Sequence, residues 1–380
     1  MKLAFVGEKH FPLTHIYTFN RFPMKTPKLP LTSTFQIDYS GLPFPPVQNP
    51  TFTFIDLCAG IGGIRIALQK LGGKCVFSSE REVKAKETYF NNHGEVPFGD
   101  IKKFTTATEP PLLFHDAIPQ HDILGAGFPC QAYSQAGLQL GFQDERGTLF
   151  FEILEIARRR RPRALILENV KGLKTHDHGR TFAVIIKSLR EAGYKVYTKV
   201  LRAIDFGLPQ NRHRIFIVAF DQPWHFEFPK PTGQRIYETL GEALEPEPEA
   251  RYTISDRTYE GLKRRLRQHR ARGNGFGYSV FNEDASYVNT ISARYWKNGS
   301  EVLVEQANAN PRMLTPRECA RLQGFPDDFI FHESRRHAYQ QFGNAVPVPV
   351  VKAVAKSVLK TLHERKMATF LSDPFEPVIL

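Results

Sequence analysis

Three kinds of side chain in this sequence could together support covalent catalysis. Cys130 follows a proline in the run Gly-Phe-Pro-Cys-Gln, Glu168 follows a short apolar run, and Arg212 and Arg214 alternate two residues apart. A thiolate is a nucleophile, a carboxyl group can transfer a proton, and arginines can lower the pKa of a nearby thiol. Each also has a plainer explanation, because a lone cysteine is usually buried and inert, and charged residues often only edge a strand.

A glycine-rich turn upstream could bind a ligand. Residues 52–57 form a β-rich run that leads into Ala-Gly-Ile-Gly-Gly at 59–63, where glycine lets the backbone approach a ligand at the carboxyl edge of a sheet. The spacing differs from Gly-x-Gly-x-x-Gly, so a dinucleotide is not the first expectation. Glu80 ends the next apolar run and Asp100 follows a glycine, positions suited to ribose hydroxyls and an adenine edge. Together these features indicate an adenosine-type ligand.

The elements that must position these residues alternate between strands and helices. The pattern predicts strands over residues 52–57, 75–78, 122–126 and 164–167. It predicts helices over 64–71, 81–91, 148–160 and 180–192, a hairpin of 194–203 with 215–220, and later helices over 315–322 and 350–366. Such alternation is typical of a mostly parallel sheet covered on both faces, an α/β fold.

Composition limits the class of protein. The chain has 380 residues, of which 41% are hydrophobic and 24% charged, which is typical of a globular protein. Residues 1–50 hold eight prolines, so we expect an irregular extension there. No uncharged apolar run approaches the ~18 residues of a membrane-spanning helix. The apolar stretch at residues 3–6 is too short for a signal peptide.

The four cysteines are scattered along the chain. Cys58, Cys75, Cys130 and Cys319 form no Cys-x-x-Cys pair and have no histidine at ligand spacing. This pattern argues against a zinc site and a disulfide framework, and it fits a reducing cytosol. We therefore expect no bound metal.

Positive charge is concentrated in one part of the sequence. The formal net charge is +12, and residues 251–300 hold ten Lys and Arg against four Asp and Glu. The densest part is 263–270, Lys-Arg-Arg-Leu-Arg-Gln-His-Arg. Such a run can bind a polyanion such as nucleic acid, and it can equally be the solvated face of a helix.

The motifs, taken in order, resemble those of the C5-cytosine-specific DNA methyltransferase family, of the bacterial restriction–modification type. The matching motifs are Asp-Leu-x-Ala-Gly-x-Gly-Gly, Gly-Phe-Pro-Cys-Gln, Glu-Asn-Val, Gln-x-Arg-x-Arg, Arg-Glu-Cys-Ala-Arg-Leu-Gln-Gly-Phe-Pro at 317–326 and Gly-Asn-Ala-Val-Pro at 343–347. They cover residues 54–350 nearly end to end. Two positions depart from the family: Cys58 stands where a Phe is usual, and Arg81 where an aromatic side chain often stacks on adenine.

The resemblance implies a fold and a division of the chain. It implies a Rossmann-like S-adenosylmethionine-dependent methyltransferase sheet with a smaller, mostly β or irregular target-recognition domain. The expected parts are an N-terminal extension (1–50), the catalytic and cofactor-binding domain (51–242), the target-recognition domain (243–315), a hinge (316–343) and a C-terminal helix that returns to the catalytic domain (344–380).

The resemblance also implies a mechanism. Cys130 attacks C6 of a flipped-out cytosine, Glu168 shares a proton with N3, and Arg214 binds O2 with Arg212 beside it. S-adenosylmethionine supplies the methyl group and becomes S-adenosylhomocysteine. The implied cofactor-binding residues are Ala59, Gly60, Ile61, Gly62, Gly63, Glu80, Arg81, Asp100, Ile101, Pro129, Leu149 and Asn344.

Double-stranded DNA is the partner that the resemblance implies. The expected DNA-binding residues are Gln131, Ser134, Lys263, Arg264, Arg265, Arg294, Tyr295 and Lys297. The basic run would contact phosphates, and Arg294 and Lys297 would read guanines. The segment 273–301 resembles recognition domains that act on CCGG- and CCNGG-like sites, which favours a short G·C-rich palindrome methylated by a monomer.

Two other interpretations remain open. One is an RNA methyltransferase of the same fold, although the Cys-Phe-Thr tripeptide typical of the tRNA-modifying branch is missing from the sequence. The other is a DNA-binding autoregulator with secondary catalysis that uses residues 1–50. The resemblance further suggests a bacterial cytoplasmic, nucleoid-associated enzyme with a cognate restriction endonuclease as its functional partner.

Overall fold

The structure is a computed structural model that describes residues 39–105, 117–128, 149–275 and 277–372. The chain divides into two units, Met1–Asp38 and Tyr39–Leu380, and all described residues belong to the second. Four of the expected site residues, Pro129, Cys130, Gln131 and Ser134, lie outside the described residues.

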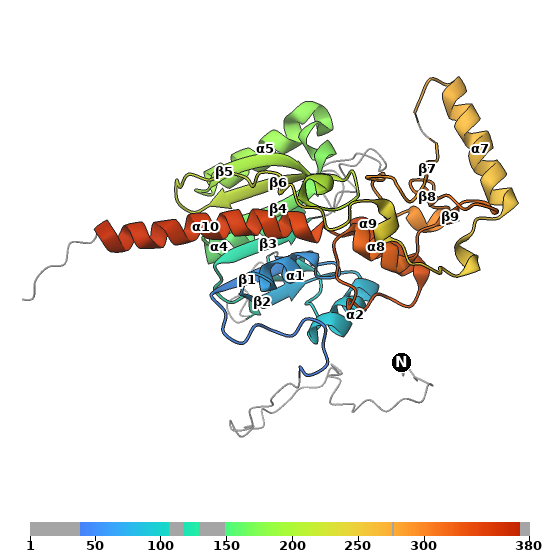
Figure 1. Cartoon of the computed structure of the whole chain (residues 1–380). Helices are drawn as coiled ribbons and strands as arrows, with labels where there is room; N and C mark the ends of the chain where they lie inside the picture. The colour runs from blue at the N-terminus through green and yellow to red at the C-terminus, as the bar shows by residue number, and fades with distance from the viewer. Residues whose placement is uncertain (1–38, 106–116, 129–148, 276, 373–380) are drawn as a thin grey trace, which may run out of the picture. The chain divides into compact units, whose positions relative to one another are not determined.

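A six-stranded sheet forms the centre of the described chain, in the order β2-β1-β3-β4-β6-β5 (Figure 1). The strands are β1 (Phe52–Leu57), β2 (Gly73–Ser79), β3 (Ile123–Gly127), β4 (Ala164–Val170), β5 (Lys195–Arg202) and β6 (His213–Phe220). Strands β1 to β4 pair in parallel, whereas β6 runs antiparallel to both β4 and β5. The expected α/β fold and its hairpin are confirmed. Because β1 lies between β2 and β3, the strand order reverses beside β1, where open α/β sheets bind ligands at the carboxyl edge.

Helices cover both faces of the sheet because neighbouring residues of each strand enter different cores. Phe54 and Ile166 belong to one core, and Ile55 and Leu165 belong to the other. The first core is covered by α1 (Gly63–Gln69) and α10 (Val348–Ser372), and the second by α4 (Leu149–Arg160) and α5 (Arg180–Glu191). Figure 1 shows α10 crossing the sheet, and it packs against α1.

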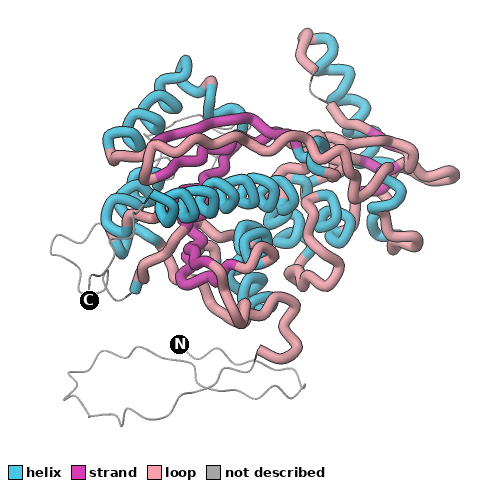
Figure 2. The backbone as a smooth tube through the Cα atoms, turned by 60° about the vertical axis from the view of Figure 1, so that its left-hand side comes forward, coloured by secondary structure: helices cyan, strands magenta, loops and turns pink. Residues whose placement is uncertain are grey.

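Most of the chain from residue 221 to residue 315, between β6 and α8 (Pro316–Leu322), is loop (Figure 2). It holds α6 (Leu240–Ala243) and a small sheet, β7-β8-β9, whose strands Val280–Phe281, Leu303–Val304 and Arg312–Met313 have two residues each. One long helix, α7 (Asp256–Ala271), also lies here and carries the basic run. The region is largely irregular, as expected, but the expectation of a mostly β or irregular domain does not include a helix as long as α7.

Helix α7 forms because its ends and one face are well defined. The Ser255 side chain accepts a hydrogen bond from the backbone N–H of Thr258 at the first turn. At the other end Gly273 takes a φ of 69°, which suits glycine. Only Leu262 is buried in the helix, in a small core with Leu303. Most of its surface is therefore left to solvent.

Three helices end the described chain. Helix α8 (Pro316–Leu322) begins with a capping box between Thr315 and Glu318 and confirms the expected helix over 315–322. Helix α9 (Arg335–Asn344) is not expected from the sequence, because its buried face is short and its sequence mostly polar. Helix α10 begins at Val348, close to the expected start at residue 350.

The described part of the expected N-terminal extension, residues 39–50, has neither helix nor strand. Phe44 nevertheless packs on the core, with its ring 5.7 Å from that of His93 and 6.2 Å from that of Phe329. The chain is thus attached to the core before residue 51. Among the described residues, no helix has the length and apolar character needed to span a membrane.

Candidate active site

The glycine turn after β1 is fixed by close packing. Gly60 and Gly62 have φ values of 56° and 86°, in the left-handed region that favours glycine. A Cβ on Gly62 would lie 2.4 Å from Nε2 of His93, and one on Gly63 would lie 2.8 Å from Cγ2 of Val346. The backbone of the turn can therefore adopt this conformation and pack this closely only with glycine at these positions.

Glu80, at the end of β2, is bonded directly to this turn. Its Oε2 accepts the backbone N–H of Gly60 at 2.8 Å, and its Oε1 accepts the N–H of Glu82 at 2.8 Å. Burial raises the pKa of Glu80, and the backbone hydrogen bonds oppose that rise. Asp100 lies nearby, with its Oδ2 3.9 Å from Nη1 of Arg81. These contacts hold acidic groups beside the turn.

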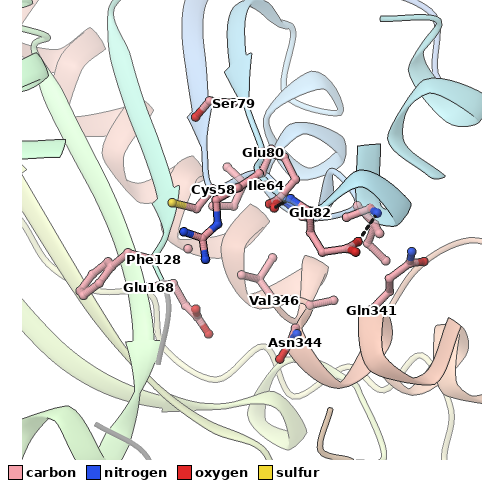
Figure 3. Close-up of a pocket in the computed structure, with 18 of the residues that line it drawn as sticks. Cys58, Ile64, Ser79, Glu80, Glu82, Phe128, Glu168, Gln341, Asn344 and Val346 are labelled. Carbon is pink, nitrogen blue, oxygen red and sulfur yellow. Dashed lines mark hydrogen bonds between the residues drawn. The ribbon is translucent and has the colours of Figure 1, made fainter. Parts of the chain in front are cut away.

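A cavity of about 570 Å³ opens in front of the turn (Figure 3). Ten of the expected cofactor-binding residues line it: Ala59, Gly60, Ile61, Gly63, Glu80, Arg81, Asp100, Ile101, Leu149 and Asn344. Gly62 is in the turn but does not line the cavity.

The far wall of the cavity comes from α9 and the chain after it, which the sequence interpretation largely missed. Val346 and Gln341 line it together with Asn344. Gln341 ties α9 to α2 (Val83–His93), since its Oε1 accepts from Thr88 Oγ1 at 3.0 Å and its Nε2 donates to the carbonyl of Lys84 at 2.9 Å. Val346 belongs to the Gly-Asn-Ala-Val-Pro motif, so the motif itself was the available signal.

Glu168 and Arg214 form a buried ion pair at the same edge. Glu168 is 7% exposed, and its Oε1 lies 2.9 Å from Nε of Arg214. The two come from paired strands, β4 and β6, in which Val170 faces Arg214. Both side chains line the cavity. Burial raises the pKa of Glu168, whereas the charges of Arg214 and Arg212 oppose that rise, so the carboxyl group can hold a proton more readily than an exposed one.

Arg212 lies elsewhere. Strand β6 begins at His213, so Arg212 precedes it, and its guanidinium donates to the carbonyls of Ile291, Gly343 and Ala345. It does not line the cavity. This placement corrects the expectation that Arg212 lies beside Arg214 where the base would bind.

Comparison with known proteins decides the family. Residues 52–360 match the model of the C-5 cytosine-specific DNA methylase family. The chain belongs to this family. It is 54% identical over 317 residues to the Type II methyltransferase M.DsaV of Dactylococcopsis salina, covering 82% of this chain and 87% of that protein. It is 52% identical over 323 residues to the Type II methyltransferase M.NlaX of Neisseria lactamica, covering 83% of this chain and all of that protein.

The fold of the methylase is also that of solved structures. The crystal structure of the S. pombe Dnmt2 methyltransferase superposes with a TM-score of 0.66 at 20% identity, covering 82% of this chain and 99% of that one. This likeness confirms the methyltransferase fold.

The methylase presents some of its expected DNA-binding residues to solvent. Arg264 and Arg265 are exposed on α7, and Arg294 and Lys297 are exposed at the two ends of a short 3₁₀ turn before β8. Lys263 is already engaged, because its Nζ donates to Glu260 at 2.8 Å and lies 4.1 Å from the centre of the Tyr259 ring.

Tyr295 is a correction. It is 1% exposed, its hydroxyl donates to the carbonyl of Val302 at 2.6 Å, and it accepts the N–H of Leu314 at 2.8 Å. A side chain so placed packs the loop and cannot reach a base edge. In the sequence, the charged neighbours Arg294 and Lys297 suggest that Tyr295 is also accessible.

Proposed function

We propose that this methylase transfers a methyl group from S-adenosylmethionine to C5 of a cytosine flipped out of duplex DNA. The observation that carries the proposal is that the buried Glu168–Arg214 pair and the Glu80-bound glycine turn line one cavity. A proton donor and an adenosine site facing one another suit a reaction between a base and such a cofactor.

The residues of the cavity fit S-adenosylmethionine. Its volume of about 570 Å³ is that of a small-molecule site. The Cys58 thiol lines the cavity, and its pKa is raised first by burial and then by the acidic groups Glu80, Asp56 and Asp100, while Arg81 opposes the rise. Glu80 and Asp100 outnumber Arg81 beside the thiol, so the local potential is negative. A sulfonium cation is favoured in such a potential. Glu80 and Asp100 would hold ribose and adenine, and Asn344 would close the other wall.

Residues of the chain then carry out the addition to C6, the protonation of N3 and the binding of O2. When bound, S-adenosylmethionine supplies an electrophilic methyl group. The Cys130 thiolate forms a bond to C6, which pushes the C5–C6 electron pair into the ring, and Glu168 protonates N3 while Arg214 binds O2. C5 would then take the methyl group that the cofactor supplies, and S-adenosylhomocysteine would be the leaving group. Loss of the C5 proton to a general base and cleavage of the C6–sulfur bond restore the C5–C6 double bond and the thiolate, and N3 returns its proton to Glu168. A stacked base cannot enter the cavity, so flipping precedes these steps.

Duplex DNA is favoured over tRNA as substrate. The relatives at about half identity are Type II methyltransferases. Exposed arginines lie along the long helix α7. The test is transfer of tritiated methyl groups from S-adenosylmethionine to duplex DNA and, in parallel, to tRNA. Label in DNA alone supports the proposal, and label in tRNA alone contradicts it.

The proposal extends to the target and the setting of the enzyme. The exposed Arg294 and Lys297 read guanines within a short G·C-rich palindrome of the CCGG or CCNGG kind, and a monomer modifies each strand in turn. The enzyme works at the nucleoid in the bacterial cytoplasm, alongside a cognate endonuclease. Bisulfite sequencing of DNA from expressing cells should give a palindromic map, and an asymmetric or A·T-centred site would remove this part of the proposal.

Replacing both Arg264 and Arg265 by alanine should flatten the salt dependence of DNA binding. Each lost phosphate contact reduces the slope of log affinity against log salt by about 0.9, so two contacts give about 2. Affinity measured from low to high salt checks this.

The matched control removes another exposed arginine pair, Arg158 and Arg159. They end α4 shortly before β4 begins, so they lie at the amino edge of the sheet, opposite the cavity. Their double alanine variant should keep the wild-type slope. An unchanged slope in the Arg264 and Arg265 variant would show that α7 is only a solvated helix.

A further inference from the structure

A short segment before β6, residues 209–212, is hydrogen-bonded to a segment of the region between β6 and α8, residues 288–291. Asn211 donates its N–H to the carbonyl of Val288 at 2.8 Å and accepts from Thr290 Oγ1 at 2.9 Å. Gln210 is fully buried, and its Oε1 accepts the N–H of Ile291 at 3.1 Å. The exposed Arg294 lies three residues after the end of this second segment.

Arg212 binds the same segment and the wall of the cavity together. It is 1% exposed, and its Nη1 donates to the carbonyl of Ile291 at 3.0 Å. Its Nη2 donates to the carbonyls of Gly343 at 2.9 Å and Ala345 at 2.8 Å. These two carbonyls lie on either side of Asn344, which lines the cavity. One guanidinium thus fixes the backbone on both sides of a cavity residue.

The packing around this guanidinium leaves little freedom. A Cβ on Gly343 would lie 2.2 Å from the carbonyl carbon of Ser292 and 2.3 Å from the N atom of Ala293, so the two backbones are in direct contact. Charge-assisted hydrogen bonds are stronger than neutral ones, and a planar guanidinium can bond several carbonyls at once. A lysine keeps the charge but cannot reproduce this fork.

Arg212 is also connected to the chemistry through the backbone. Two residues later, Arg214 pairs with Glu168 at 2.9 Å. The strand that carries Arg214 is held in register with β4. A shift of Arg212 would therefore move the ion pair relative to both the cavity wall and the 288–291 segment.

We propose that Arg212 is a positioning residue that holds the 288–291 segment, which leads to the exposed Arg294, against the Asn344 wall and the Glu168–Arg214 pair, so that bound DNA is aligned with the reacting groups. The inference rests on the proposed function. Without the hydrogen bonds of Arg212, DNA and cofactor still bind, but the cytosine is not aligned with the reacting groups. Small misplacements of reacting groups slow chemistry about 100-fold.

The test is the first turnover of Arg212→Lys. Enzyme saturated with methyl-tritiated S-adenosylmethionine is mixed with excess duplex DNA and unlabelled cofactor. The amplitude of labelled DNA counts folded, loaded enzyme, and the rate constant reports alignment. We expect the rate constant to fall about 100-fold, with DNA affinity changed by less than about threefold. A rate constant within about threefold of wild type, even at reduced amplitude, would overturn the proposal, because it would show a purely structural role.

Arg312→Lys is the matched control. Arg312 is also buried, at 5% exposure, and its guanidinium pairs with Glu318 at 2.9 Å, away from the cavity. Its variant should lose amplitude and thermal stability but keep the rate constant. A rate loss equal to that of Arg212→Lys would attribute the effect to general loosening and contradict the proposal.

A milder variant decides the matter if Arg212→Lys does not fold. Thr290→Val keeps the shape of the side chain and removes only its hydrogen bond to Asn211. We expect a rate constant lowered about tenfold at full amplitude, and an unchanged rate constant would overturn the proposal. Wild-type enzyme that transfers no label at all would instead refute the proposed function, and this inference with it.

Discussion

Glu168→Gln is expected to slow methyl transfer about 10²- to 10⁴-fold, the usual contribution of a positioned proton donor. Glutamine fills the same space beside Arg214 but cannot give a proton to N3. The affinity for S-adenosylmethionine, measured by calorimetry, should change by less than about threefold, because Glu80 and not Glu168 is bonded to the glycine turn. First-turnover rates of wild type and variant give the main result.

The pH dependence gives a second result on the same residue. Burial raises the pKa of Glu168 above that of an ordinary carboxyl group. Since the proposed mechanism uses the protonated form, its contribution should be present below this pKa and be lost as pH rises through it. Glutamine does not titrate, so the variant should lack this alkaline decline.

Glu318→Gln is the control for Glu168. Glu318 is fully buried and paired with Arg312, but it lies outside the cavity. Its variant should be less stable, with a first-turnover rate near that of wild type. If Glu168→Gln loses cofactor binding rather than rate, Glu168 is a structural residue and its assignment as proton donor is wrong.

Cys130→Ser is expected to abolish methyl transfer, with a loss of at least about 10⁴-fold, while DNA affinity stays within about threefold. A serine hydroxyl at neutral pH is too weak a nucleophile to attack C6, and the surfaces that contact DNA are unchanged. Transfer assays and anisotropy with labelled duplex check the two parts.

Cys75→Ser is the matched control, since Cys75 is a buried thiol in β2 whose Sγ lies 3.4 Å from the carbonyl of Phe77. It should keep the wild-type rate. Turnover of Cys130→Ser within about tenfold of wild type would exclude a covalent role for this cysteine.

The parts of the fold that the sequence predicts are those set by local patterns. Short apolar runs bounded by turn residues predict β1 and β4, and the glycines at 60 and 62 predict a tight turn that the structure places in the left-handed region. Glu80 could be assigned to the turn because it ends the strand next to β1. For β1, β4 and the glycine turn, the determining residues lie within a few positions of one another, whereas Glu80 is 20 residues from Gly60.

The parts that could not be predicted depend on contacts between distant segments. Arg212 finds its partners 79, 131 and 133 residues away, and no local pattern distinguishes it from Arg214. Tyr295 is buried because its hydroxyl bonds two backbone groups, although its neighbours are exposed. Helix α9 packs through few apolar residues, among them Phe342, so its periodicity is weak.

The most direct test of the central claim is the identity of the methylated base. Duplex DNA is incubated with the enzyme and methyl-tritiated S-adenosylmethionine, digested to nucleosides and separated by chromatography. The account predicts label in 5-methyldeoxycytidine alone, and none with Cys130→Ser. Label in N4-methyldeoxycytidine or in a purine nucleoside would contradict it.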